Sequence, residues 1–73
     1  MEAIIASPAD LGRLVRHTRE SRGITQRDLS AQLGVSQRWL SELEAGKGKH
    51  INERYFAVLG ALGIHLRATV SDV

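Results

Sequence analysis

Residues 23–47 have the sequence GITQRDLSAQLGVSQRWLSELEAGK, and this stretch decides the fold. Thr25 is a good N-cap for a helix, because its hydroxyl can accept from a backbone N–H of the first turn. Leu29 and Leu33 would form one buried stripe on that helix. Gly34 then supplies the left-handed conformation in which helices commonly end. The first half of the stretch therefore predicts a short helix that stops at a tight turn.

A second short helix follows this turn. Ser36 can cap it, Leu40 and Leu43 are its apolar residues, and Gly46 ends it. Two helices of this length are not stable alone and must pack on other elements. Their spacing is that of a helix-turn-helix over about residues 25–44, which presents its second helix to a DNA groove.

Further helices are predicted on both sides of this motif. Ser7 and Pro8 suit the cap and the first position of a helix that runs to about Arg22. A last helix is predicted over about residues 52–62, with apolar residues at helical spacing. The chain is thus predicted to be all-α, with four to five helices in a single DNA-binding domain over residues 1–73.

The segment after the last helix has a different pattern. Residues 64–70 alternate apolar and polar side chains, which predicts a β-strand over about residues 64–71. A single strand leaves its backbone groups without partners. Residues 3–6 could pair with it in the same chain, or it could pair with its copy in a second chain; we favour the second as the main contact. The predicted dimerisation residues are Ile64, Leu66, Ala68 and Val70.

Size and composition restrict the class of protein. A chain of 73 residues is below the size at which one core is comfortably stable, and dimerisation is a common remedy. The chain has no cysteine, and its three histidines show no ligand spacing, so we expect no metal and no cofactor. It also lacks a nucleophile–base pair and a glycine-rich phosphate loop, so we expect no catalytic residue and no enzyme. Since neither a membrane span nor a signal peptide is present, we expect a cytoplasmic protein.

Positive charge is unevenly distributed along the chain. The net charge is only +2, which by itself does not indicate a nucleic-acid partner, because charge must be clustered to attract one. The simplest explanation of the basic residues is that they lie on solvated helix faces. Two groups stand out: Arg13, Arg16, Arg19 and Arg22 in the first helix, and Lys47, Lys49 and Arg54 after the motif.

A known family shares several residues of the motif. They are Thr25-Gln26, Leu29, Leu33-Gly34-Val35-Ser36 and Glu44-Ala45-Gly46. Together they resemble the signature of phage-repressor-type helix-turn-helix domains, the Cro/C1 or xenobiotic-response-element (XRE) family. The resemblance spans about residues 8–63 and implies a lambda-repressor-like fold. Ser30 stands where the family usually has alanine, and a buried serine hydroxyl can bond back to a helix carbonyl.

The short chain and its predicted last strand resemble one branch of this family, the HipB-type antitoxins. This resemblance implies a small repressor that dimerises partly through its C-terminal strand and represses its own operon. It also implies a HipA-type serine/threonine kinase toxin as a partner. Because the sequence ends at Val73, any unstructured antitoxin tail is expected to be short. Two alternatives stay open: a plain phage-type repressor without a toxin, and a protein-interaction module that has lost DNA binding.

Four residues are predicted to contact bases. In the phage-repressor geometry the N-terminal part of the second motif helix lies in the major groove, and Gln37 and Arg38 fall there. Arginine can bond guanine bidentately and glutamine can do so with adenine, each pair giving about 1–3 kcal/mol of discrimination. Ser41 and Glu42 lie one turn further along, where Glu42 could accept from cytosine.

A second group is predicted to contact the backbone of double-stranded operator DNA. It consists of Gln26, Thr25, Ser36, Lys47 and Lys49. Gln26 begins the first motif helix, whose free N–H groups suit a phosphate, and the resemblance implies that it also braces Gln37. The two hydroxyl residues are helix caps first, and the two lysines lie on a glycine-flanked loop. Such contacts position the protein without carrying sequence information.

The remaining notable side chains have structural interpretations. Trp39 could point at the groove and pack on a thymine methyl or a sugar. Alternatively, it could shield the protein's own surface or meet a partner. The resemblance implies a structural pair between Arg19 of the first helix and Glu44 at the end of the recognition helix. Loss of one partner would be costly if this pair is buried.

Overall fold

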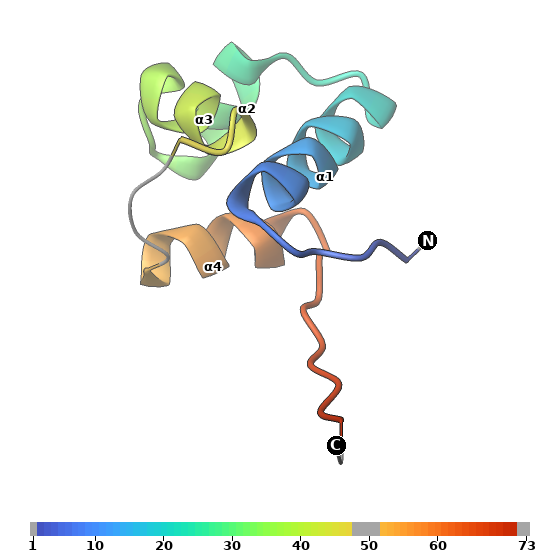
Figure 1. Cartoon of the computed structure of the whole chain (residues 1–73). Helices are drawn as coiled ribbons and strands as arrows, with labels where there is room; N and C mark the ends of the chain where they lie inside the picture. The colour runs from blue at the N-terminus through green and yellow to red at the C-terminus, as the bar shows by residue number, and fades with distance from the viewer. Residues whose placement is uncertain (1, 48–51, 72–73) are drawn as a thin grey trace.

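The computed structural model describes residues 2–47 and 52–71, and these residues contain four helices and no strand (Figure 1). The helices are α1 (Pro8–Ser21), α2 (Gln26–Leu33), α3 (Gln37–Glu44) and α4 (Glu53–Ala61). α3 packs against both α1 and α2. Figure 1 shows α2 and α3 together at one end of the molecule, with α1 and α4 along the other side. The predicted all-α, helix-turn-helix architecture is confirmed.

Each helix begins at a side-chain cap. The side chains of Ser7, Thr25, Ser36 and Asn52 accept hydrogen bonds from the backbone N–H groups of Asp10, Asp28, Trp39 and Tyr55, respectively. Each cap satisfies a donor of the first turn that has no partner inside its helix. A cap residue is itself not helical. α2 and α4 therefore begin at Gln26 and Glu53, one residue after the starts at 25 and 52 that the sequence predicts.

The turn between α2 and α3 has the conformation that the sequence predicts. Gly34 has φ 69° and ψ 28°, a left-handed conformation that costs a residue with a Cβ atom. The N–H of Val35 then donates to the carbonyl of Ser30 at 3.0 Å. Ser30 is buried, and its hydroxyl donates to the carbonyl of Arg27 at 2.9 Å, so this polar side chain is satisfied inside α2.

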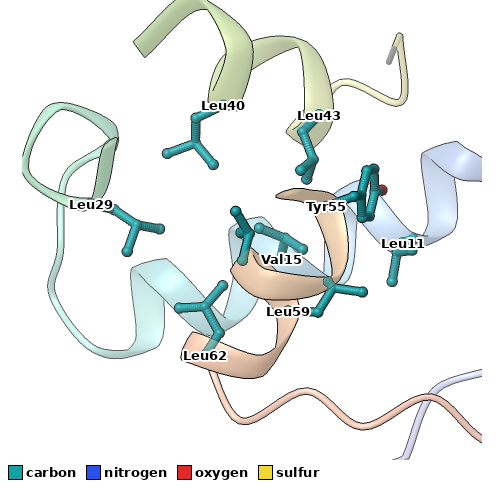
Figure 2. Packing of buried hydrophobic residues seen from close by; sticks show 9 residues of the cluster. Leu11, Val15, Leu29, Leu40, Leu43, Tyr55, Leu59 and Leu62 are labelled. Carbon is teal, nitrogen blue, oxygen red and sulfur yellow. The ribbon is translucent and has the colours of Figure 1, made fainter. Parts of the chain in front are cut away.

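The core lies between α1, α3 and α4, with one residue from α2. Its buried members are Leu11, Val15, Leu29, Leu40, Leu43, Tyr55, Val58, Leu59 and Leu62. Figure 2 shows Leu40 and Leu43 pointing from α3 toward Val15. Because both leucines are almost fully buried, α3 is held by its inner face, and its opposite face is left for other contacts.

The C-terminal tail is not a strand in the single chain. Residues 64–71 have no regular secondary structure, and the same is true of residues 2–6. The single chain therefore does not form the predicted strand, and pairing with residues 3–6, which the sequence left open, is not observed. A strand needs a partner for its backbone groups, which accounts for the difference. Ile64 packs against the core, whereas Leu66 and Val70 are exposed. Pairing of the tail with a second copy stays a prediction.

Within residues 2–47 and 52–71, no helix is both long enough and apolar enough to cross a bilayer.

Candidate nucleic-acid interface

The outer face of α3 carries three of the four predicted base contacts in exposed positions. Gln37, Arg38 and Ser41 are exposed, and Glu42 is half-buried. They share this face because Leu40 and Leu43, which are three positions apart, lie on the opposite side of the helix and point into the core. The fold therefore places an arginine, a glutamine and a hydroxyl side by side on a helix that the core holds in place.

Arg38 and Glu42 form an ion pair along this face. The Arg38 Nε donates to Glu42 Oε1 at 3.2 Å, at the (i, i+4) spacing that places two side chains next to each other on a helix surface. The Arg38 side chain is 90% exposed and the Glu42 side chain 46% exposed. Exposed pairs of this kind contribute little to stability, on the order of 0.3–0.5 kcal/mol.

Arg19 of α1 and Glu44 of α3 form a buried ion pair. The Arg19 Nε donates to Glu44 Oε2 at 2.7 Å, and its Nη2 donates to Glu44 Oε1 at 3.0 Å. A third donor, Nη1, reaches the carbonyl of Ile24 at 2.7 Å. Both charged residues are buried, and the hydrogen bonds to Glu44 raise the pKa of Arg19 above its usual value. This bidentate pair ties α1 to the end of α3 and to the loop before α2.

Gln26 is bound to the same pair. The Gln26 Nε2 donates to Glu44 Oε1 at 3.0 Å, and Gln26 is half-buried. The expected brace between Gln26 and Gln37 is therefore replaced by a contact with Glu44. Sequence reasoning missed this contact, because Gln26 and Glu44 are far apart in the sequence and no local pattern connects them. The bond leaves the other amide N–H and the Oε1 of Gln26 for a ligand.

Four other residues are predicted to contact the DNA backbone, and the structure describes three of them. Thr25 and Ser36 are caps whose oxygens accept backbone N–H groups at 3.1 and 3.0 Å, as the sequence predicts, and their own hydroxyl protons stay available to a phosphate. Lys47 is exposed just beyond α3, and its N–H donates to the carbonyl of Glu42 at 2.9 Å. Lys49 lies outside the described residues.

Trp39 packs on the protein's own surface. Its ring meets Tyr55 edge-on, with 6.4 Å between ring centroids and an interplanar angle of 70°. The guanidinium carbon of Arg54 lies 5.8 Å from the Trp39 ring centroid. Both partners belong to α4, so the structure favours the shielding interpretation of Trp39 over a groove contact.

Burial raises the pKa of Tyr55 above its usual value near 10. At a pH above the unfolded-state pKa, the unfolded chain loses the phenol proton first, so this contribution to stability is lost as the pH rises through the higher native pKa. We expect the melting temperature of the wild type to fall above about pH 10 and that of Tyr55→Phe to fall less. Thermal unfolding followed by circular dichroism from neutral to alkaline pH checks this. Parallel curves for both proteins would contradict it.

The described residues contain no group of three or more histidine, cysteine, aspartate or glutamate side chains that could hold a metal ion. Within the same part of the chain, every buried side-chain nitrogen or oxygen has a hydrogen-bond partner. The side-chain polar atoms without a hydrogen-bond partner in this part of the chain are therefore exposed to solvent.

Comparison with known proteins places the chain in a family. The sequence matches the helix-turn-helix domain family over residues 10–69. It is 39% identical over 59 residues to the uncharacterized HTH-type transcriptional regulator y4mF of Sinorhizobium fredii (strain NBRC 101917 / NGR234), a match that covers 81% of this chain and 78% of that protein. It is also 28% identical over 60 residues to the endothelial differentiation-related factor 1 homolog of Danio rerio, covering 82% of this chain but 41% of that protein.

Solved complexes of HipB contain chains with the same fold. A chain of the HipA-HipB-O2-O3 complex gives a TM-score of 0.79 at 22% identity, covering 97% of this chain and 100% of that one. A chain of the HipB-O4 20mer complex gives 0.80 at 22% identity, with coverage of 97% and 100%. A chain of the HipB-O1-O2 complex gives 0.74 at 27% identity, again with coverage of 97% and 100%. The chain belongs to the helix-turn-helix domain family of transcriptional regulators, and its fold is that of HipB.

Proposed function

We propose that this chain is a sequence-specific repressor that binds operator DNA through α3. The observation that carries the proposal is the outer face of this helix, where Gln37, Arg38 and Ser41 are exposed. Leu40 and the buried Arg19–Glu44 pair hold the helix from behind. A fixed helix with hydrogen-bonding side chains near its N-terminus is the arrangement that reads base edges in the major groove.

The residues around α3 can supply the backbone contacts that fix its register. Gln26 has a free amide N–H beside the start of α2, and Lys47 is exposed just beyond the end of α3. Contacts on both flanks of a recognition helix orient it without selecting bases. The likeness to chains of the HipB-O4 20mer complex supports nucleic-acid binding by this fold.

We further propose a homodimer and an antitoxin role. The apolar side chains of Leu66 and Val70 are exposed in the single chain, and a tail-to-tail ribbon would cover them and satisfy the strand's backbone groups. Two recognition helices would then lie about 34 Å apart and meet a palindromic site. A HipA-like kinase toxin as partner is supported by the likeness to a chain of the HipA-HipB-O2-O3 complex. A cytoplasmic, non-catalytic protein fits these roles.

Arg38→Ala is expected to remove the preference for one base pair in each half-site. Loss of a bidentate arginine–guanine contact costs about 1–3 kcal/mol of discrimination. The measurement starts with selection of bound duplexes from a randomised library at low ionic strength. Binding titrations then compare the selected sequence with sequences changed at single positions, for the wild type and for the variant.

Lys47→Ala is the matched control, because Lys47 is proposed to contact a phosphate and such contacts do not depend on the base sequence. It should weaken binding of all duplexes alike and reduce the slope of log affinity against log salt by about 1, with the selected sequence unchanged. A wild-type protein that enriches no sequence from the library would refute the proposal that the chain is a sequence-specific repressor. An Arg38→Ala protein that enriches the wild-type sequence with undiminished preference would refute base reading by Arg38.

A further inference from the structure

We propose that Glu42 does not contact a base but holds Arg38 in the orientation that reads guanine. This proposal rests on the proposed function, since it concerns a residue of the same reading face. Glu42 would thus be a positioning residue whose effect on sequence preference passes through Arg38. The prediction that Glu42 accepts a hydrogen bond from cytosine is the competing assignment.

The geometry of the ion pair carries the proposal. Glu42 Oε1 takes the Nε proton of Arg38, at 3.2 Å, and so binds the side of the guanidinium group. Within residues 2–47 and 52–71, the structure places no acceptor on either terminal nitrogen, Nη1 or Nη2, of Arg38. A bidentate contact with guanine O6 and N7 uses two parallel N–H groups of the guanidinium fork. The contact with Glu42 therefore leaves the end of the fork, with its two terminal nitrogens, available for guanine.

The exposure of the two side chains explains why such a support matters. The Arg38 side chain is 90% exposed, so packing restricts its rotamers little, whereas the Glu42 side chain is only 46% exposed. A free arginine must lose rotamer freedom when it binds a base, and a restraint that is already present reduces this loss. The expected benefit is a contribution of about threefold to tenfold to discrimination by Arg38.

The charge of Glu42 argues against a direct base contact. A carboxylate that enters a groove between two rows of phosphates is repelled unless a cation accompanies it. The cation in this structure is Arg38, and the hydrogen bond between them is charge-assisted. Since Oε1 accepts from Arg38 Nε, a contact with cytosine would have to come from Glu42 Oε2, and it would bring the carboxylate closer to the surrounding negative charge.

A second ion pair on the chain provides a matched control. Arg16 and Glu20 on α1 are also an (i, i+4) pair, with Arg16 Nε 3.3 Å from Glu20 Oε1 and side chains 63% and 55% exposed. This pair has the same spacing and a similar distance between the charged groups, but it lies outside the proposed reading face. If Glu42 served only to stabilise its helix, Glu42→Ala and Glu20→Ala would have the same consequences.

The test compares six proteins in the library selection and the titrations described above. They are the wild type and the Glu42→Ala, Glu42→Gln, Glu20→Ala and Arg38→Ala/Glu42→Ala variants, with Arg38→Ala as the background for the last. Thermal unfolding of each protein first checks that it is folded. Glu42→Gln keeps an oxygen that can accept from Arg38 Nε but removes the charge, so it serves as the conservative rescue.

Three results are expected. Glu42→Ala lowers the preference for the guanine read by Arg38 by about threefold to tenfold, and it leaves the other positions unchanged. Glu42→Gln keeps most of that preference, and Glu20→Ala keeps all of it. In the Arg38→Ala background, removal of Glu42 causes no further change in preference at any position.

The outcomes that overturn the proposal are equally specific. Loss of preference at a separate base pair that persists in the Arg38→Ala background would establish a direct base contact by Glu42. If the Glu42→Ala variant keeps the wild-type preference for guanine, the Arg38–Glu42 ion pair has no part in base reading. Failure of the proposed function has a different signature, because the wild type itself would then select no sequence.

Discussion

We expect the substitution Glu44→Ala to lower the free energy of unfolding by about 3–5 kcal/mol. The change leaves the Arg19 guanidinium buried without its counter-charge, since both bonds of the bidentate pair are lost. It also removes the partner of Gln26 Nε2. A domain of this size has a total stability of about 4–11 kcal/mol, so the expected loss removes from about a quarter of this stability to all of it.

Urea unfolding at one fixed protein concentration measures this effect, because the proposed homodimer would make stability depend on concentration. Glu20→Ala, which breaks an exposed ion pair on α1, should cost less than about 0.5 kcal/mol under the same conditions. The double replacement Arg19→Met/Glu44→Leu should recover more than half of the loss, because two apolar side chains leave no charge unpaired. A Glu44→Ala protein within about 1 kcal/mol of the wild type would show that water reaches Arg19 and replaces its partner.

The sequence predicted those parts of the fold that depend on neighbouring residues. Thr25 and Ser36 cap helices through N–H groups three residues further on, and Gly34 ends a helix through its own backbone conformation. Each of these signals acts within one helical turn, so it can be recognised without knowledge of the rest of the chain. The same holds for the apolar spacing that places Leu40 and Leu43 in the core.

Contacts between distant residues could not be predicted in the same way. The bond between Gln26 and Glu44 spans 18 positions, and the edge-on contact of Trp39 with Tyr55 joins two different helices. Local spacing leaves several orientations open for such side chains, and only the packed helices select one. The tail over residues 64–71 illustrates a further limit: its alternating pattern describes a strand only if a second strand is present, and a single chain does not supply one.

Gly12→Ala is expected to destabilise the protein by about 2 kcal/mol or more, although alanine favours a helix interior by about 1 kcal/mol. The reason is the close approach of α1 to the end of α3. A Cβ atom at Gly12 would lie 2.5 Å from the carbonyl oxygen of Glu44, 2.8 Å from its carbonyl carbon, and closer still to the carbonyl oxygen of Leu43. These atoms belong to the backbone and cannot move aside as a flexible side chain would, so α3 itself would have to shift.

Gly60→Ala provides the control of opposite sign. Gly60 lies in α4, and a Cβ atom there would meet nothing within 4 Å, so the same chemical change should stabilise the protein by up to about 1 kcal/mol. Thermal unfolding of both variants separates intrinsic helix preference from steric contact. Since α3 carries Arg38 on its outer face, the shift forced by Gly12→Ala should also lower affinity for a selected duplex, whereas Gly60→Ala should leave it unchanged. Equal stabilisation by both substitutions would mean that α1 and α3 are not in contact at Gly12, and the bracing of the recognition helix by α1 would have to be abandoned.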